Sequence, residues 1–523
     1  MVPANGSCWN AGPLPALEQT KDHTLTEPPP AQAARPATAQ FAAGVNALAL
    51  DGAWASATGA LASGVVVVGF ALELGAGAAA VGLLAALPFF AHLAQLPAVA
   101  LVERLRRRRT IAVGAITASR VVILLLAAAP LLLPGPAALW ALVAGQALIA
   151  LLVAVGSCAW NSWVHDFLRA ADLGRIFARR LALSTAFALA ASVLASVVLG
   201  AWPQDRKLAA FSVLFFLGAW AGFLSSAFLA RVPDAPMAQT EPFSYRRSLA
   251  EPLRDINFRR LILFVATWSF ANNLAAPFFA VYLIAQVGLD LSMVVILSVI
   301  SQIANIATLS IWGRISDRYS NKSILQVAAP VSLAGILALV FAEAPQSLAL
   351  RLALLALLHL VMGAAAAGVA LANGNIALKL APAGRATGYL AALGVAGALA
   401  SGVAPLIGGG LADWFAAREF RLSLAWVAPG RVVETPLLAL RHWQFFFALA
   451  VGAGLFALHR LSLVREEGTV EQRIVVAEFM LAARQAVRNL SSVGGAADRG
   501  DVSAHAAATG RTRRRNAERG ADR

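Results

Sequence analysis

The sequence predicts an all-α membrane protein in which twelve transmembrane helices form two six-helix pseudo-repeats. The chain of 523 residues is 59% hydrophobic and 13% charged, which is more apolar than the surface of a soluble globule accommodates. Apolar runs of about 20 residues, each long enough to cross about 30 Å of hydrocarbon as a helix, recur roughly twelve times. A charged loop pattern appears once in each half, which indicates an internal duplication.

The apolar runs divide the chain into two halves, expected at 45–230 and 260–463. Helices are favoured over strands because the runs are twice as long as a membrane strand needs. The expected spans in the first half are 47–72, 77–102, 110–133, 137–160, 180–202 and 208–230. In the second half they are 260–284, 290–312, 323–342, 347–372, 387–411 and 437–460.

Three polar segments flank these halves. Residues 1–44 include three prolines at 28–30 and show no apolar period, so we expect a disordered tail. Residues 231–259 form the expected linker, and 464–523 a second tail. That tail contains an amphipathic pattern over 469–490, which predicts a helix resting on the loops or the bilayer surface, ahead of a disordered basic segment.

Basic residues orient the spans, because Lys and Arg are retained on the cytoplasmic side. They gather in alternate loops, while the opposite loops are nearly bare apart from Arg206, Lys207 and a long loop near Arg418. We therefore expect a multi-pass protein of the cytoplasmic membrane with both termini inside the cell, and the Ala- and Arg-rich usage favours a bacterial source. The net charge of +15 reflects this topology, so no nucleic-acid partner is expected. The expected state is a monomer in the lipid bilayer.

The sequence offers no pattern for an enzyme. Cys8 and Cys158 are the two cysteines, which allows no disulfide framework. No Cys/His metal cluster, no Walker loop and no acidic pair in a soluble domain is found, so we expect no catalytic residue, no metal and no cofactor. Any energy for moving a solute would come from an ion gradient or from the gradient of the solute.

The repeated loop carries the strongest motif. Residues 102–109 read Val-Glu-Arg-Leu-Arg-Arg-Arg-Arg and 313–322 read Gly-Arg-Ile-Ser-Asp-Arg-Tyr-Ser-Asn-Lys. Segments 74–111 and 287–324 align without a gap, which places Glu103 and Asp317 within one position of each other.

This loop resembles a signature of the major facilitator superfamily of secondary transporters, Gly-x-x-x-Asp-Arg-x-Gly-x-Lys/Arg. Gly313, Asp317, Arg318 and Lys322 match it, with Ser320 at the second Gly. The first half departs further, with Val99, Glu103 and Arg106 at the Gly, Asp and second Gly positions. The resemblance covers about residues 45–465 and implies two halves around a central cavity.

The resemblance implies a gating role for these loops, because a transporter alternates between two packings of its halves. In one state, an acid such as Asp317 can accept a hydrogen bond from an Arg or lie near a helix N-terminus. In the other state it can lose that partner. The alternative is that these are ordinary cytoplasmic basic residues with an incidental acid. The candidate gating residues are Gly313, Arg314, Asp317, Arg318 and Lys322, with Glu103 and Arg104 in the first half.

A second loop pair follows the fourth span of each half. Trp160 and Asp166 lead to Gly174 and Arg175, and Asn373-Gly-Asn375 leads to Gly384 and Arg385. The first of these loops is similar to a poorly characterised bacterial branch of the same superfamily.

Ionisable residues inside spans are costly and are therefore candidates for function. Arg120 lies about ten residues into the third span, near mid-membrane. It needs a carboxylate, carbonyls or a wet cavity, and Asp51, Glu73, His92 and Gln95 are the available neighbours. A structural pairing and a role with an anionic substrate both remain open. His92 and His359 suggest either a proton relay or hydrogen-bonded packing.

In the family, the first and fourth helices of each half line the cavity, which selects the candidates Asp51, Gln146, Asn272, Asn273 and His359. The seventh span holds Pro277 one turn after the two amides, so it is expected to be a broken helix that exposes carbonyls, or a simple proline kink. The small-residue run 394–410 in the eleventh span suits close packing against a moving neighbour.

These features together predict secondary-active transport of a small organic solute by alternating access. Few charges lie in the cavity helices, so we expect a neutral, amphipathic or singly charged solute, with proton coupling as a hypothesis. The alternatives are efflux of lipophilic compounds, and a non-transporting receptor or lipid-handling protein that retains the fold.

Overall fold

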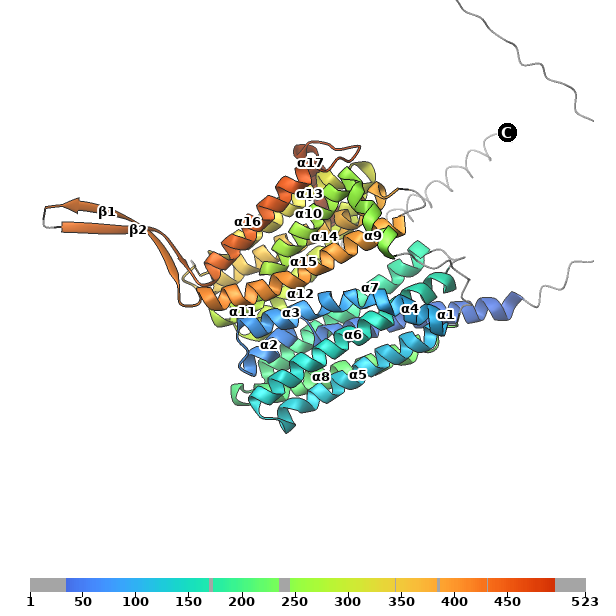
Figure 1. Ribbon diagram of the computed structural model, residues 1–523. Coiled ribbons are helices and arrows are strands. Elements are labelled where there is room, and N and C mark those ends of the chain that lie inside the picture. The colour runs from blue at the N-terminus through green and yellow to red at the C-terminus, as the bar shows by residue number, and fades with distance from the viewer. Residues whose placement is uncertain are drawn as a thin grey trace, which may run out of the picture.

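The chain folds into long helices and one β-hairpin, and the helices form two groups that lie one above the other in Figure 1. The computed structural model describes residues 34–168, 173–234, 245–343, 345–382, 386–429 and 431–493. Within these residues, 11 helices are long and apolar enough to cross a membrane, or 12 if the bent pair Ala78–Leu93 and Pro97–Leu105 is one span. The predicted all-α fold with twelve spans is confirmed.

The N-terminal group supplies six spans, of which the first and second are each divided in two. Gly64 separates the parts of the first span, and a 48° bend separates those of the second. The helices are α1 (Ala34–Ala62) with α2 (Val65–Glu73), α3 (Ala78–Leu93) with α4 (Gln95–Leu105), α5 (Arg108–Leu132), α6 (Gly135–Phe167), α7 (Leu173–Ala201) and α8 (Lys207–Leu229), with a short 3-10 turn at Gln204–Arg206.

The C-terminal group repeats this order after a short helix, and its first span is likewise divided. The helices are α9 (Tyr245–Arg254), α10 (Ile256–Ala275) with α11 (Phe278–Ala285), α12 (Leu291–Arg318), α13 (Asn321–Leu339), α14 (Leu348–Leu380), α15 (Ala386–Phe415), α16 (Trp443–Ser462) and α17 (Gln472–Val493). The strands β1 (Glu419–Ala428) and β2 (Arg431–Arg441) stand between α15 and α16.

Several boundaries differ from those expected. Helix α1 begins at Ala34, inside the expected tail, and residues 1–33 and 494–523 lie outside the described residues. Helix α10 begins at Ile256 because the Asp255 carboxylate accepts from the backbone N–H groups of Asn257 and Phe258.

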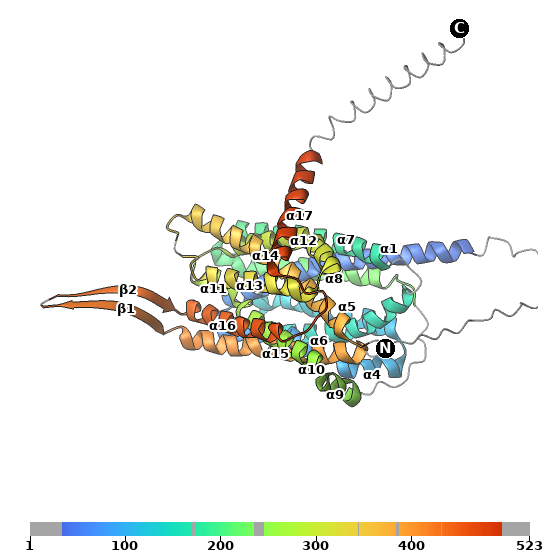
Figure 2. The ribbon, with the colours of Figure 1, turned by 90° about the horizontal axis from the view of Figure 1, so that it is seen from above.

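The β-hairpin was not predicted. Its strands pair antiparallel from Glu419 with Arg441 to Ala428 with Arg431, so the last span begins at Trp443 and not at 437. The hairpin projects from one end of the bundle in Figures 1 and 2, and Trp426 near its tip is 73% exposed. We call this end the hairpin side. The opposite end, which carries the loops 102–109 and 313–322, is the loop side.

The two groups meet most closely on the hairpin side, through α3 and α15. A Cβ added at Gly82 would lie 2.2 Å from the Pro405 carbonyl oxygen, and one at Gly409 would lie 2.6 Å from that of Ala78. The Asp413 carboxylate at the end of α15 accepts from the backbone N–H groups of Ala78 (3.3 Å) and Ala79 (3.1 Å), at the start of α3. The glycines of the small-residue run thus permit backbone contact, and Asp413 caps a helix of the other group.

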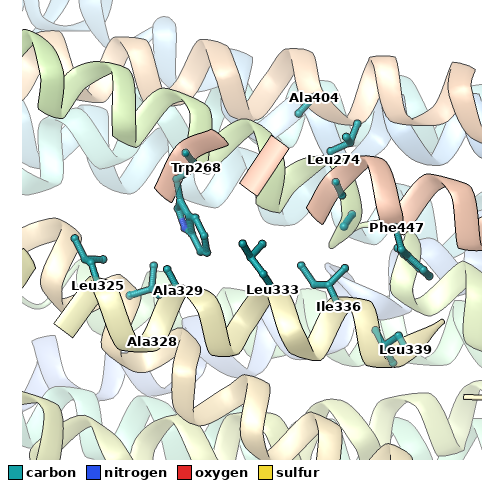
Figure 3. Close-up of a cluster of buried hydrophobic side chains, with 14 of the residues drawn as sticks. Trp268, Leu274, Leu325, Ala328, Ala329, Leu333, Ile336, Leu339, Ala404 and Phe447 are labelled. Atoms are coloured by element: carbon teal, nitrogen blue, oxygen red, sulfur yellow. The ribbon is translucent and has the colours of Figure 1, made fainter. Parts of the chain in front are cut away.

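Each group has its own buried core. In the C-terminal group, Trp268 of α10, Leu333 and Ile336 of α13 and Phe447 of α16 lie together in Figure 3. In the N-terminal group, Phe70 stacks on Phe211 with ring centroids 5.1 Å apart. The two clusters lie mainly within one group each and touch where the groups meet, through Ala78 and Val81 of α3 and Val295 of α12, so the groups can move as two bodies.

Helix α17 lies near the expected amphipathic segment and packs onto the loop side of the C-terminal group. Phe479 packs on Trp312 of α12 with ring centroids 4.5 Å apart, and Glu478 pairs with Arg318 at 2.7 Å. Its later turns leave the bundle in Figure 2. The apolar face therefore rests on the protein through its first turns.

Candidate functional site

The first span of each group is interrupted at the same depth. Helix α1 ends before Ser63 and Gly64, where Gly64 has φ 57, a left-handed conformation that glycine adopts without a steric penalty. Helix α10 ends before Ala276 and Pro277, as the proline predicted. The alignment that places 74–111 on 287–324 also places Gly64 on Pro277. The break in the first span was missed because a lone glycine is a weak signal in an apolar helix.

These two breaks border one cavity of about 610 Å³ between the groups. Its wall includes Ser63 and Gly64 from one break and Ala276 and Pro277 from the other. Most of the remaining wall is apolar, including Val65, Val68, Phe89, Phe279, Leu283, Ile336 and Met362. Unwound backbone facing a cavity is a common way to bind a solute inside a membrane protein.

Three of the five predicted cavity residues line this space: Gln146, Asn272 and His359. The Gln146 Nε2 atom is buried without a hydrogen-bond partner, whereas His359 Nδ1 lies 2.8 Å from the Leu355 carbonyl oxygen of its own helix. Gln302 of α12 also lines the cavity and was missed. Ser298, Ser301 and Gln302 stand at helical spacing on one face, and that spacing was the available signal.

Asn273, the fourth candidate, turns away from the cavity. Its Nδ2 donates to the Ser269 carbonyl oxygen (2.9 Å) and to Ser401 Oγ of α15 (3.2 Å). Adjacent helical residues point about 100° apart, and here Asn272 borders the cavity while Asn273 faces α15. The prediction that Asn273 lines the cavity was wrong.

Asp51, the fifth candidate, is also absent from this wall. It is 4% exposed inside the N-terminal group. Ser225 Oγ of α8 donates to its Oδ1 (2.8 Å), and Arg180 Nη2 of α7 lies 3.6 Å from its Oδ2. A Cβ at Gly52 would lie 2.7 Å from Arg180 Nε, so that glycine makes room for the arginine. Asp51 is therefore a buried structural acid.

A side cavity of about 340 Å³ opens within the N-terminal group. It shares Ser63, Leu84, Pro88 and Gln146 with the central cavity, so the two spaces adjoin. Arg120 of α5 lies in its wall, and the Arg120 Nε atom is buried without a partner.

The other two predicted intramembrane groups differ from Arg120. His92 lines the side cavity, with Nδ1 2.6 Å from the Pro88 carbonyl oxygen. Glu73 is exposed at the last residue of α2, on the hairpin side. Glu73 is the last residue of the span Gln40–Glu73, and its role as an intramembrane charge stays a prediction.

The first charged loop makes its turn without glycine, through Arg106 in a left-handed conformation (φ 49). Arg108 is 3% exposed, and its Nη1 donates to Asp166 Oδ2 (2.6 Å) and to Ser162 Oγ (2.9 Å) at the end of α6. Arg109 donates to the carbonyl oxygen of Ala230, after α8. Glu103 and Arg104 are exposed. The loop is thus joined to the ends of α6 and α8 through residues other than the predicted pair.

The second charged loop is joined to the chain after α16. Lys322 Nζ donates to the carbonyl oxygens of Ser462 (3.1 Å) and Val464 (2.7 Å). The alignment of the halves pairs Lys322 with Arg109, so both cations cap the sixth span of their own half. Glu466, which was not predicted, accepts from the backbone N–H groups of Asn321 (3.2 Å) and Lys322 (2.7 Å) at the start of α13.

The remaining residues of the second loop are less constrained. Asp317 and Arg314 are exposed, and Asp317 makes no hydrogen bond or ion pair with the described residues. A Cβ at Gly313 would meet nothing within 4 Å. Neither the acid nor the glycine is used in this arrangement, so their gating role stays a prediction.

The loop after the fourth span is only partly described. Arg180 lies over the Trp160 ring at 4.9 Å, and Asp166 pairs with Arg108 as above. Gly174 and Arg175 lie in the first turn of α7, while Arg385 lies outside the described residues. Trp160 thus supports the arginine that pairs with Asp51.

Comparisons with known proteins agree with this geometry. At 14% identity, the chain is similar to a mutant of the nucleoside transporter NupG (TM-score 0.62, covering 81% of this chain and 100% of that one). At the same identity it is similar to a D-xylose-proton symporter (TM-score 0.60, covering 82% of this chain and 99% of that one). It is also similar to the inward open xylose transporter XylE from E. coli (TM-score 0.57, covering 83% of this chain and 98% of that one). A comparison with curated proteins found no match. Identity this low shows the fold alone, but a family model matches residues 52–405 directly, and the chain therefore belongs to the Major Facilitator Superfamily.

Proposed function

We propose that the protein moves a small organic solute across the cytoplasmic membrane by alternating access. The observation that carries this is the cavity of about 610 Å³ between the two broken spans, bordered by both halves. Only a site shared by both halves changes its access when the halves rock. The proposal assigns the protein no enzymatic step.

We place the loop side in the cytoplasm, because the loops there carry most of the Arg and Lys residues. Two sets of hydrogen bonds join the halves on the hairpin side in the described part of the chain. The Asp413 carboxylate accepts from the backbone N–H groups of Ala78 and Ala79, and Ser196 Oγ donates to the Ser292 carbonyl oxygen (3.0 Å). This supports an inward-facing state, closed on the outside.

A thermal-shift screen of the purified protein against metabolites and drugs tests the proposal, since a ligand that binds the folded state raises its apparent stability. Each hit then enters a flux assay in proteoliposomes. Saturable uptake is expected, and binding without any flux would favour a receptor on the same fold.

The proposal includes a more specific hypothesis, that transport of the solute is coupled to protons. His359 in the cavity wall is its support, since histidine changes charge near neutral pH. An imposed pH gradient should change the initial rate of uptake, and the variant His359→Gln should abolish that dependence. A rate of uptake that does not depend on the pH gradient would reject proton coupling and leave the transport function standing.

Efflux of lipophilic compounds is the second candidate, favoured by the apolar side chains of the cavity wall, such as Phe89, Phe279 and Met362. Expression in a pump-deficient strain should then raise resistance to several unrelated lipophilic drugs. An unchanged resistance profile in a strain that makes the protein would reject it.

A further inference from the structure

The side cavity of about 340 Å³ is bordered by a cation, Arg120, whose buried Nε atom has no hydrogen-bond partner among the described residues. A Cβ at Gly222 of α8 would lie 2.4 Å from Arg120 Cδ. The Cγ, Cδ and Nε atoms of Arg120 therefore lie against the backbone of α8, and the same side chain borders the cavity.

The nearest buried acid is already paired. Asp51 accepts from Ser225 Oγ (2.8 Å) and lies 3.6 Å from Arg180 Nη2. Two arginines thus share one carboxylate in this part of the N-terminal half, and guanidinium stays protonated in proteins. A lasting positive charge this deep in a membrane protein is costly unless it binds something.

Other groups around the two adjoining cavities also favour an anion. Gln146, which borders both, has a buried Nε2 donor without a partner. Helix α2 begins at Val65 beside the break, and no side chain caps its N-terminus, so its free N–H groups carry partial positive charge. No Asp or Glu is among the described residues that line either cavity.

We infer that the side cavity is an anion subsite, and that the solute is an organic monocarboxylate whose carboxylate binds Arg120 and whose apolar body occupies the central cavity. The planar guanidinium fork matches a carboxylate with two parallel hydrogen bonds. Two arginines around one carboxylate leave an excess of one positive charge, which selects a solute with one negative charge, and the apolar wall selects the rest of the molecule. This inference rests on the proposed transport function and narrows its substrate class.

The test compares three probes with one skeleton: 4-phenylbutyrate, 4-phenylbutanamide and 4-phenylbutylamine. Binding to the purified full-length protein in lipid nanodiscs is measured by calorimetry. The carboxylate should bind the wild-type protein at least about tenfold more tightly than the amide, as a charge-assisted bidentate contact requires. The variant Arg120→Gln should bind the carboxylate and the amide equally, and Arg120→Lys should keep part of the preference for the carboxylate.

Arg351→Gln is the matched control. Arg351 also has a buried Nε without a partner, but it lies outside both cavities, at the start of α14. Its loss should leave the carboxylate preference unchanged. Equal binding of carboxylate and amide to the wild-type protein, no binding of any probe, or an unchanged preference in Arg120→Gln would each overturn the inference.

A second measurement separates a subsite from a structural pair. Without ligand, Arg120→Gln should melt at or above the wild-type temperature, because it removes the excess positive charge, whereas Arg180→Gln should melt lower, because it removes the ion-pair partner of Asp51. A drop in Arg120→Gln as large as that in Arg180→Gln would make Arg120 structural. Flux of neutral solutes with no carboxylate preference would overturn the inference and leave the transport function standing, while the absence of flux for every screening hit would overturn the transport function.

Discussion

The two halves of this protein share a helix order and place their charges differently. The N-terminal half buries charge deep among its helices, with Asp51, Arg180 and Arg120. The C-terminal half satisfies its interior with neutral groups, such as Trp312 Nε1 donating to the Ala364 carbonyl oxygen (2.8 Å), and concentrates its ionic contacts around Glu466 on the loop side. Under the anion subsite proposed above, solute selection falls to the N-terminal half, while the C-terminal half attaches the C-terminal segment.

The largest expected effect comes from removing the buried acid of the N-terminal half. Asp51→Ala leaves Arg180 without its ion-pair partner and Ser225 Oγ without its acceptor, which should lower the free energy of unfolding by about 3 kcal/mol, the low end for a buried pair because Arg180 keeps some solvent access. Thermal denaturation in detergent measures this. Asp317→Ala, at an exposed acid, is the control and should change little. Equal melting temperatures for Asp51→Ala and Asp317→Ala would show that the buried charges do not stabilise one another.

The next effect should be confined to the C-terminal half. Glu466→Ala removes the acceptor for two backbone N–H groups at the start of α13 and the partner of Lys379 at 3.1 Å, at a cost of about 2 kcal/mol. Hydrogen exchange should speed up in α13 and α17 and stay unchanged in α1 to α8. The neighbouring Glu467→Ala, at an exposed side chain, should have no such effect. Faster exchange across both halves would contradict the separation of their cores.

A smaller effect is expected where the halves meet. Asp413→Ala removes the cap that the C-terminal half provides to α3, worth about 1 kcal/mol, which corresponds to about a fivefold shift toward the state open on the hairpin side. A cysteine introduced at Ala78, which is 8% exposed where the halves meet, in a Cys8→Ser, Cys158→Ser background should react faster with an impermeant maleimide. Asp205→Ala, which loses an exposed contact within one half, is the control. An unchanged labelling rate would mean that Asp413 does not hold the closed state.

The smallest effect on stability is expected at the predicted gating acid. Asp317→Asn should change the free energy of unfolding by less than about 0.5 kcal/mol, because the side chain is exposed. It should slow turnover more than it weakens solute binding, if the acid gains a partner in the other state. Weaker binding at unchanged turnover would contradict the gating role.

The sequence was sufficient for features that depend on local physics. Apolar length identifies spans, so the membrane fold was predictable, and Pro277 removes a backbone hydrogen bond wherever it stands in a helix, so the break before α11 was predictable. Gln146, Asn272 and His359, which line the cavity, were selected by the family resemblance and not by local physics. In contrast, the sequence pattern did not predict the β-hairpin. The end of its second strand, Arg431–Arg441, overlaps the start of the expected span 437–460.

Only the tertiary structure decided which polar groups meet. Asp51 and Arg180 stand far apart in the chain, and their contact depends on the packing of α1 on α7, which composition does not encode. The same holds for Glu466 at the start of α13 and for Asp413 at the start of α3. The sequence determined that Arg120 is a costly charge inside a span, since helix rise alone sets its depth. That it faces a cavity and lacks a partner was decided by the neighbouring helices, because a charge is satisfied or left free by groups brought close in space.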